Sequence, residues 1–414
     1  MAKNPALVRP FRGLRPAPGR AADVAAPPYD VVNEAEARAA ADGKPFSFLH
    51  VSRAEIDFPI GTDSHADAVY KKARANLDAM VATGVLVRDE EPCYYAYRLK
   101  MGDHVQTGIV GAGSVAEYDR NRIRRHELTR PDKEDDRVRN MEALAAQTGP
   151  VMVTHRKDAA VAAVIAAATA REPASHVVAE GGVEHTIWVI DAAAEIEALN
   201  AAFDAMDAIY IADGHHRSAS ASRVAAARRT PASSGKEAHD FFLIVSFPDD
   251  EVQILDYNRL VQDLNGLSEA EFLARIEDDF TVEALDGAQR LAEARRFTMY
   301  LGGQWYGLGL KAPVATDDPV AALDISVLTD RLLAPVLGIG DPRLDDRIQF
   351  VGGIRGMAGL SERVDSGEMA VAFALYPTSL NDLMAVADAN QVMPPKSTWF
   401  EPKLADGLVS AVLD

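Results

Sequence analysis

The sequence predicts an α+β protein with mixed, largely antiparallel sheets. Three observations lead to this fold class. Hydrophobic residues make up 48% and charged residues 25% of the 414 residues, the usual proportions of a globular protein. β-forming residues alternate around a tight turn in "CYYAYRLKMGDHVQTG", which predicts an antiparallel hairpin. Apolar residues recur elsewhere at helical spacing, so helices accompany the sheets.

The length of the chain predicts two or three packed units, because one ordinary core does not extend over this many residues. We place soft boundaries near Pro173 and Asp250. They give an N-terminal α/β region with a charged loop (1–173), a core segment with an Asp-Gly-His-His-Arg turn (174–250) and a C-terminal α/β region (251–414). No internal repeat marks these boundaries, so the units can be interwoven.

The individual elements follow from local patterns along the chain. The first stretch, 7–32, is rich in Pro and Arg and predicts loops and short strands. A second stretch, 124–137, is dense in charge and predicts a loop that leads into a helix carrying Met141 and Leu144. The other expected helices cover 33–42, 66–84, 159–170, 218–228 and 325–337, and one begins with a capping box from Ser268 to Glu271. Besides the hairpin and a second one around "MYLGGQWYGLGL", strands are expected at 151–155, 186–190, 208–212, 240–247, 348–351 and 370–375, and "MPPKSTWFEPKL" is expected to be a loop.

Charge and cysteine content exclude several classes of function. The formal net charge of -19 repels nucleic acids and anionic membranes at long range, so neither is an expected partner. The single cysteine, Cys93, excludes an intramolecular disulfide and a cysteine zinc cluster, and we expect it in a core strand. The amino terminus lacks a signal-peptide pattern, and the longest apolar run, 159–170, is shorter than the ~20 residues of a membrane span. We therefore expect a cytoplasmic protein.

The segment "IADGHHRSAS", 211–220, carries the strongest local signal for a site. A buried strand ends at Asp213, Gly214 makes a turn and a helix follows, so free backbone N–H groups and the positive helix end face an anion. His215, His216 and Arg217 add donors, and Asp213 can hold a cation bound to a phosphate or remove a proton from an alcohol. The competing interpretation is an Asp213 N-cap beside surface histidines. Zinc is disfavoured for the His-His pair, because neighbouring helical residues point about 100° apart.

Two further motifs predict anion binding less specifically. The charged run "RRHELTRPDKEDDR" (124–137) has no helical amphipathicity, and a loop rich in Arg and Lys suits a multiply charged phosphate donor, although a solvated ion-pair surface is its ordinary alternative. The turn "VGGIRG" and the segment "MPPKSTWFEPK" can also hold an anion, although the sequence favours glycine packing for the first and the packing of Trp399 for the second. No P-loop, nucleophile elbow, His-Glu-x-x-His or Cys-x-x-Cys motif is present.

The segments "VAAPPYDVV", "RHELTRPDKEDDR", "YIADGHHR", "DDRIQFVGGIRG" and "MPPKSTWFEPKL" resemble, in this order, a bacterial and archaeal family described as a domain of unknown function. The resemblance extends over nearly the whole chain. Its "DGHHR" box is similar to that of free serine kinases within the ParB and sulfiredoxin-like superfold, so the resemblance implies a core of that kind. Fold analogy alone does not establish a function.

The resemblance implies a Mg²⁺-dependent kinase that transfers a phosphoryl group from pyrophosphate or ATP to the hydroxyl of free L-serine or a similar amino acid. The alternatives are a ParB-like nucleotide- or DNA-binding protein without kinase activity, and a non-catalytic scaffold. Asp213 and Glu127 are the candidate catalytic carboxylates, and Asp213 is also the candidate Mg²⁺ ligand. The candidate residues for binding the phosphates of the donor are Arg125, His126, Arg130, Lys133, Arg137, Gly214, His215, His216, Arg217, Gly353, Arg355 and Lys396. The expected partner is a small serine-like substrate, and the oligomeric state is left open.

Overall fold

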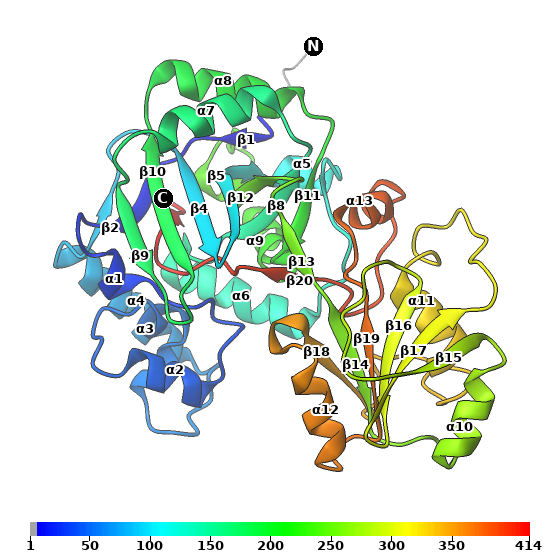
Figure 1. Cartoon of the computed structure of the whole chain (residues 1–414). Helices are drawn as coiled ribbons and strands as arrows, with labels where there is room; N and C mark the ends of the chain where they lie inside the picture. The colour runs from blue at the N-terminus through cyan, green and yellow to red at the C-terminus, as the bar shows by residue number, and fades with distance from the viewer. Residues whose placement is uncertain (1–5) are drawn as a thin grey trace. The chain divides into compact units, whose positions relative to one another are not determined.

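The computed structural model describes residues 6–414. These residues form two compact units (Figure 1). The first unit runs to Val252 and takes up the chain again at Pro402–Asp414, and the second is Gln253–Glu401. The boundary expected near Asp250 lies close to this division, the one near Pro173 falls inside the first unit, and the three-segment division stays a prediction. The first five residues of the amino-terminal stretch, where we expect no signal peptide, lie outside the described residues.

The α+β fold class with largely antiparallel sheets is confirmed within the described residues. The large sheet of the first unit has the strand order β6-β11-β8-β12-β5-β4-β10-β9, and β1 pairs with β5. All pairs in it are antiparallel except β6 with β11 and β8 with β12. Its strands are β1 (Val8–Arg9), β4 (Tyr94–Met101), β5 (His104–Ser114), β6 (Ile123–Arg124), β8 (Val151–His155), β9 (Ser175–Val178), β10 (Glu184–Ile190), β11 (Ile209–Asp213) and β12 (Phe241–Pro248). The predicted hairpin is β4 and β5, which close at Met101 and His104.

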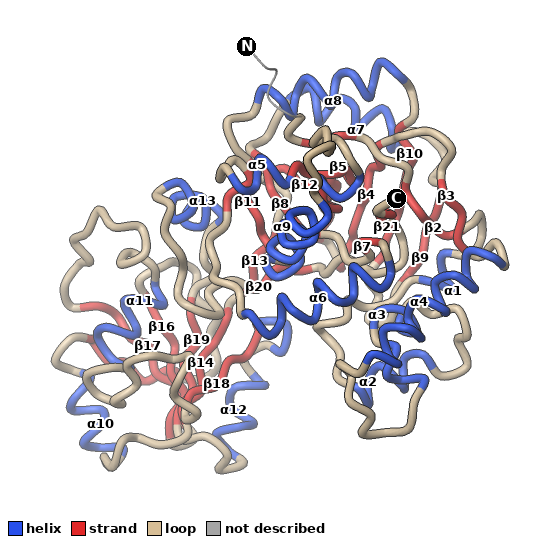
Figure 2. The backbone as a smooth tube through the Cα atoms, turned by 180° about the vertical axis from the view of Figure 1, so that it is seen from behind, coloured by secondary structure: helices blue, strands red, loops and turns tan. Residues whose placement is uncertain are grey.

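Helices cover both faces of this sheet (Figure 2). The helices of the first unit are α1 (Ala21–Val24), α2 (Glu34–Ala41), α3 (Leu49–Ser52), α4 (Asp67–Ala82), α5 (Val115–Asp119), α6 (Pro131–Leu144), α7 (Ala159–Thr169), α8 (Ala193–Ala205) and α9 (His215–Arg228), with short 3-10 turns η1 (Ala54–Asp57) and η2 (Ala238–Asp240). On one face α7 and α8 pack together, and on the other α9 packs with α5 and α6. Their buried side chains join those of the strands in one core cluster.

A smaller sheet and the first four helices complete this unit. The small sheet has the order β3-β2-β21-β7, with β2 (Gly13–Pro16), β3 (Leu86–Arg88), β7 (Ala146–Gln147) and β21 (Ser410–Val412). A second core cluster joins α2, α3 and α4 to these strands. Because β21 comes from the last residues of the chain, the C-terminal stretch belongs to the first unit. Cys93 is buried as expected, but it forms an isolated bridge with Phe11 just before β4 and is not part of a strand.

The second unit is built on a six-stranded sheet, counted within the described residues, with the order β15-β17-β16-β19-β14-β18. Its strands are β14 (Tyr257–Val261), β15 (Phe280–Leu285), β16 (Arg296–Leu301), β17 (Gln304–Leu310), β18 (Ile348–Gly352) and β19 (Val371–Leu375), and β13 (Gln253–Leu255) pairs separately with β20 (Trp399–Glu401). Its helices are α10 (Glu269–Ile276), α11 (Asp324–Leu328), α12 (Ala358–Asp365) and α13 (Leu380–Asp388), with a π turn η3 (Thr329–Leu333) and a 3-10 turn η4 (Gly353–Arg355). The Ser268–Glu271 capping box begins α10 as predicted.

Two local expectations hold only in part, and one is wrong. The charged run leads into a helix as expected but is not a loop throughout, since α6 begins at Pro131; proline suits the first helical position, and Asp132 and Glu134 complement the positive end of the helix. The helix expected over 325–337 is present as α11 and the π-helix η3 that follows it directly, but it ends at Leu333. The segment expected as a loop near the end contains β20, which pairs with β13. None of the helices in residues 6–414 is long and apolar enough to cross a membrane.

Candidate functional site

The strand–turn–helix predicted at "IADGHHRSAS" is present, and Gly214 makes it possible. Gly214 has φ 98°, a conformation that costs any residue with a side chain. A Cβ on this residue would also lie 3.3 Å from the Cα of Val151 on the neighbouring strand. Gly214 is the N-cap of α9 and no side chain caps the helix, so the interpretation of Asp213 as an ordinary N-cap is wrong. The first turn of α9, which begins at His215 and not at Ser218, therefore has no side-chain acceptor at its positive end.

Asp213 is an ionised carboxylate held by a lysine from the far end of the chain. Lys403 Nζ donates a hydrogen bond to Asp213 Oδ2 at 3.1 Å. Burial alone would raise the pKa of Asp213, but the positive charges of Lys403 and Arg217 outweigh it and hold this pKa well below its usual range. A carboxylate with such a low pKa is a poor proton acceptor. Asp213 is therefore better suited to hold a positively charged group in place than to act as a general base.

Arg217 is buried and tied to the protein on two sides. Its Nη1 donates to the carbonyl oxygen of Pro150 at 2.5 Å, and its Nη2 donates to Asp30 Oδ2 at 3.0 Å. Burial opposes its charge, but Asp30, Asp213 and further groups more than compensate and raise the pKa of Arg217. The hydrogen bonds of the guanidinium thus hold α9 against the segments that contain Pro150 and Asp30. We expect its positive charge to favour an anion at the first turn of α9.

Parallel pairing brings the charged run beside this turn. β6 pairs in parallel with β11, with Ile123 opposite Ile209, so the residues that follow both strands leave the sheet at the same edge. His126 and Glu127 follow β6, and His215 follows β11. The rings of His126 and His215 lie 4.5 Å apart at 85°, and His215 Nδ1 is 3.8 Å from Glu127 Oε2. His126, Glu127 and His215 thus form one cluster.

The histidines of this site carry no positive charge at neutral pH. Burial lowers the pKa of His126 to about 4 and that of His215 well below its usual value. Burial also lowers the pKa of His216, whose Nε2 accepts a hydrogen bond from the backbone N–H of Arg130 at 3.1 Å. Any anion at this turn is therefore bound by neutral N–H donors and backbone amides, not by imidazolium charge.

A cavity of about 520 Å³ opens beside the cluster. Its walls come from α5, the segment after β6, and the first turns of α6 and α9. The lining residues are Tyr118, Asp119, Arg125, Glu127, Leu128, Thr129, Glu134, His215, Ala219 and Ser222. Arg125 is exposed and its Nη1 donates to the Tyr118 hydroxyl at 3.3 Å, so its guanidinium lies at the cavity wall. The volume is sufficient for a small substrate together with phosphate groups.

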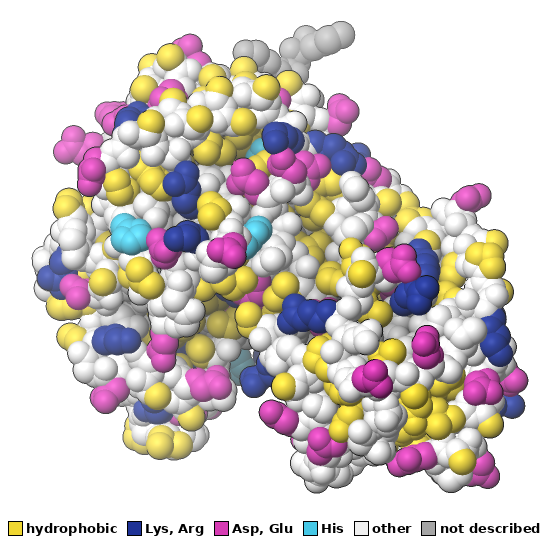
Figure 3. All heavy atoms as spheres, in the orientation of Figure 1, with side chains coloured by type: hydrophobic (Ala, Val, Ile, Leu, Met, Phe, Trp, Pro, Cys, Tyr) yellow, Lys and Arg dark blue, Asp and Glu magenta, His cyan; other side chains and the backbone are white. Residues whose placement is uncertain are grey.

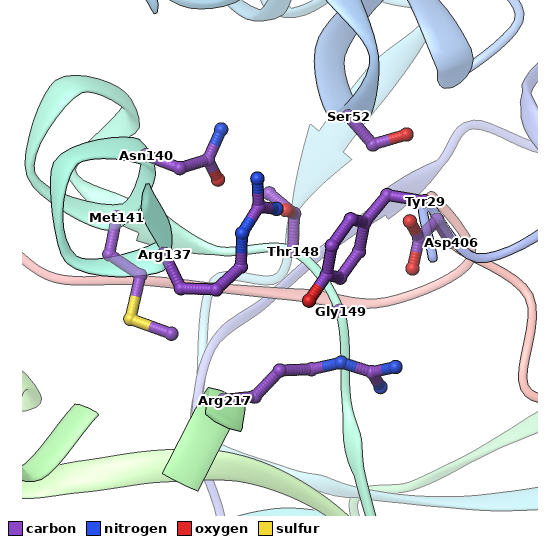
Figure 4. Close-up of a pocket in the computed structure, with 9 residues that line it drawn as sticks. All are labelled: Tyr29, Ser52, Arg137, Asn140, Met141, Thr148, Gly149, Arg217 and Asp406. Carbon is purple, nitrogen blue, oxygen red and sulfur yellow. The ribbon is translucent and has the colours of Figure 1, made fainter. Parts of the chain in front are cut away.

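A second, small cavity has Arg217 among its lining residues (Figure 4). Its volume of about 20 Å³ has room for roughly one water molecule. The ring of Tyr29 lies within cation–π distance of the guanidinium groups of Arg137 and Arg217, at 3.9 and 5.7 Å, and Figure 4 shows Asp406 on the side of the ring opposite Arg137. Burial raises the pKa of Asp406 to about 7 despite the nearby Arg217.

The raised pKa of Asp406 predicts a pH-dependent stability. The unfolded chain ionises this carboxyl near pH 4, whereas the folded chain does so near pH 7, so ionisation weakens the fold as the pH rises through this window. We expect Asp406→Asn to gain stability relative to the wild type between pH 5 and pH 8. Urea unfolding at both pH values measures this difference. An equal difference in the free energy of unfolding at pH 5 and pH 8 would contradict the raised pKa of Asp406. The control is Asp119→Asn, which removes a carboxylate at an exposed helix end.

The other residues expected from the sequence are placed as follows. Arg130 pairs with Asp132 at an exposed position, and Lys133 is exposed on α6. Arg137 is bound to Asp136 beside Tyr29 and not in the larger cavity. Gly353 and Arg355 lie in η4, and Lys396 lies in the loop before β20, all in the second unit; their part in the site stays a prediction.

Two residues that contribute to this site were not predicted from the sequence. Asp406 lies in no motif, and Lys403 lies in the segment that the packing of Trp399 explains. Both belong to the C-terminal stretch that rejoins the first unit. The pairing of Ala26 with Asp406, together with that of β21 with β2 and β7, places this stretch in the first unit, and no local sequence pattern indicates these long-range pairings.

Comparison with known proteins gives one family and several remote structures. The model of a family described as "Protein of unknown function (DUF1015)" matches residues 8–326. A free serine kinase in complex with AMP is 11% identical, with 73% of this chain and 92% of that chain covered and a TM-score of 0.34. SbnI with a C-terminal truncation from Staphylococcus aureus is 12% identical (72% and 85% covered, TM-score 0.37), and a conserved hypothetical protein from Pyrococcus furiosus is 12% identical (72% and 93% covered, TM-score 0.32). No curated protein matches the chain.

Proposed function

Because this chain belongs to the DUF1015 family of proteins of unknown function, we propose an activity from its own site, that of a small-molecule kinase. The kinase transfers a phosphoryl group from pyrophosphate or ATP to the hydroxyl of free L-serine or a similar amino acid, with Mg²⁺. The family assignment confirms the resemblance seen in the sequence. The observation that carries the proposal is the start of α9, which has no side-chain cap, directly beside a cavity that contains a carboxylate and a guanidinium.

Donor phosphates fit the start of α9. Backbone N–H groups in its first turn, the helix dipole and the N–H groups of neutral His215 and His216 all favour an anion there. Arg125 at the cavity wall can add a bidentate contact to phosphate oxygens. Phosphoryl transfer depends mainly on positioning and charge neutralisation, which is what this set of groups supplies.

The two candidate carboxylates then take different roles. Glu127 lines the cavity with 42% of its side chain exposed, so it can reach the acceptor hydroxyl and accept its proton. Asp213 is paired with Lys403 and ionised, so it suits a Mg²⁺ ion that accompanies the phosphates. The sequence left open which of the two carboxylates is the base, and this proposal gives that role to Glu127.

The alternative, nucleic-acid binding without catalysis, has less support. The formal net charge of -19 opposes phosphate backbones. On the face drawn in Figure 3, the basic side chains are interspersed with acidic ones and form no continuous basic strip. A cytoplasmic location agrees with the proposed substrates.

The direct test incubates the purified full-length protein with L-serine and Mg²⁺ and, in turn, pyrophosphate, ATP or ADP. Mass spectrometry of the products is expected to detect O-phosphoserine with at least one donor. If no donor yields phosphoserine or the phosphate of another hydroxy amino acid, the proposal is wrong. Donor binding without turnover would favour a nucleotide-binding protein instead.

A further inference from the structure

Three side chains of the kinds that bind metals come together beside the larger cavity, and two of them, Glu127 and His215, line it. One ligand atom from each of His126, Glu127 and His215 lies within 4.8 Å of the others. His126 and Glu127 are adjacent after β6, whereas His215 begins α9, so two separate segments of the first unit supply the cluster. Local sequence patterns do not indicate this cluster, because His215 converges with His126 and not with its neighbour His216.

His126 is the unusual member of this cluster. Its side chain is 1% exposed, and neither ring nitrogen makes a hydrogen bond of the usual geometry among the described residues, although the backbone of Ile211 lies near the ring and partly offsets the lowering of its pKa. Leaving a buried polar group without a partner costs on the order of 1–3 kcal/mol, so such a group in a folded protein needs an explanation. A bound metal ion would supply the missing partner.

His215 faces the same point. Its Nδ1 lies 3.8 Å from Glu127 Oε2, while its Nε2 receives the backbone N–H of His126 only at 3.5 Å. That distance exceeds the usual 2.7–3.2 Å of such hydrogen bonds, so little free energy is lost if the His215 ring gives up this bond to coordinate a metal. The charge of Asp213, which acts on both histidines, offsets the positive end of α9.

A second cluster, of one histidine and two carboxylates, differs in the bonds that its side chains already make. Glu237, His239 and Asp240 also group their ligand atoms within 4.8 Å. In this second cluster Glu237 accepts three backbone N–H groups, and Asp240 pairs with Arg229. A metal there would compete with these bonds, whereas a metal at the first cluster would give the buried ring of His126 a partner.

We propose that His126, Glu127 and His215 bind a divalent transition metal such as Zn²⁺. Two imidazoles and one carboxylate suit such an ion, whereas Mg²⁺ prefers oxygen ligands only. Three protein ligands leave a coordination position, and Glu127 and His215 both line the cavity, so that position opens toward it. This ion is distinct from the Mg²⁺ of the proposed reaction.

The metal has one consequence that rests on the proposed function. While Glu127 is a ligand, it cannot accept the proton of the acceptor hydroxyl. Zinc is therefore expected to inhibit phosphoryl transfer in the presence of saturating Mg²⁺. Binding itself can be measured without any substrate, so failure of the kinase proposal leaves the metal proposal standing and the reverse also holds.

The test titrates Zn²⁺ into the metal-free full-length protein in excess Mg²⁺, by calorimetry and elemental analysis. One tightly bound equivalent is expected. His126→Gln and His215→Gln should each weaken binding beyond the roughly 10–100-fold that loss of a hydrogen bond to a metal ligand costs. His216→Gln and His239→Gln are matched controls and should leave the affinity unchanged.

X-ray absorption at the zinc edge of the wild-type complex keeps the test independent of whether the variants fold. Two imidazole ligands and oxygen ligands are expected. An unaltered affinity in His126→Gln, loss of binding in the His239→Gln control alone, or a zinc ion with fewer than two imidazoles would overturn the proposal.

Discussion

Replacing Glu127 with Gln is expected to lower kcat for phosphoserine formation by about 10²–10⁴-fold, the usual contribution of a general base. The amide keeps the size of the side chain at the cavity wall but cannot accept a proton. The KM values for donor and acceptor should change much less, because the groups that bind phosphate are untouched. Steady-state kinetics with the best donor measures both parameters.

Glu142→Gln is the matched control for this prediction. Glu142 has nearly the same side-chain exposure, 41% against 42%, but it pairs with Arg228 on the outer side of α6 and α9, away from the cavity. Its kcat should equal that of the wild type. A Glu127→Gln enzyme with wild-type kcat would remove Glu127 from the role of base.

Replacing Arg217 with Ala is expected to destabilise the fold by about 3 kcal/mol or more. The guanidinium is 6% exposed and bonds to Pro150 and Asp30, and its loss leaves the buried Asp406 without its closest compensating charge. Lysine at this position should recover only part of the loss, because it cannot make both bonds in the same geometry.

Chemical denaturation measures this change, with Arg228→Ala as the control. Arg228 forms an ion pair with the half-exposed Glu142, and such pairs contribute about 0–1 kcal/mol. If Arg217→Ala were no more destabilising than Arg228→Ala, the structural role of the buried arginine would be refuted.

The local part of this site could be predicted from the sequence. The run ending at Ala212, the Asp-Gly pair and the helix-forming residues after it determine a strand, a turn and a helix by short-range preferences alone. The hairpin of β4 and β5 and the capping box at Ser268 are of the same kind, since each depends on residues close together in the chain.

The pairwise contacts of the site could not be predicted in this way. His126 meets His215 only because β6 pairs with β11, and Lys403 reaches Asp213 only because the chain end returns to the first unit. The start of α6 could not be predicted for a different reason. The charged run shows no helical amphipathicity, and the helix begins at Pro131 because proline is favoured at the first position of a helix.

The start of α9 is expected to bind the phosphates of the donor. Backbone amide NMR of the full-length protein, titrated with pyrophosphate and Mg²⁺, detects such binding residue by residue. The largest shifts are expected at the amides of Gly214, His215, His216 and Arg217, with smaller ones at Arg125. Pyrophosphate binding that leaves these amides unshifted and perturbs another part of the chain would contradict it.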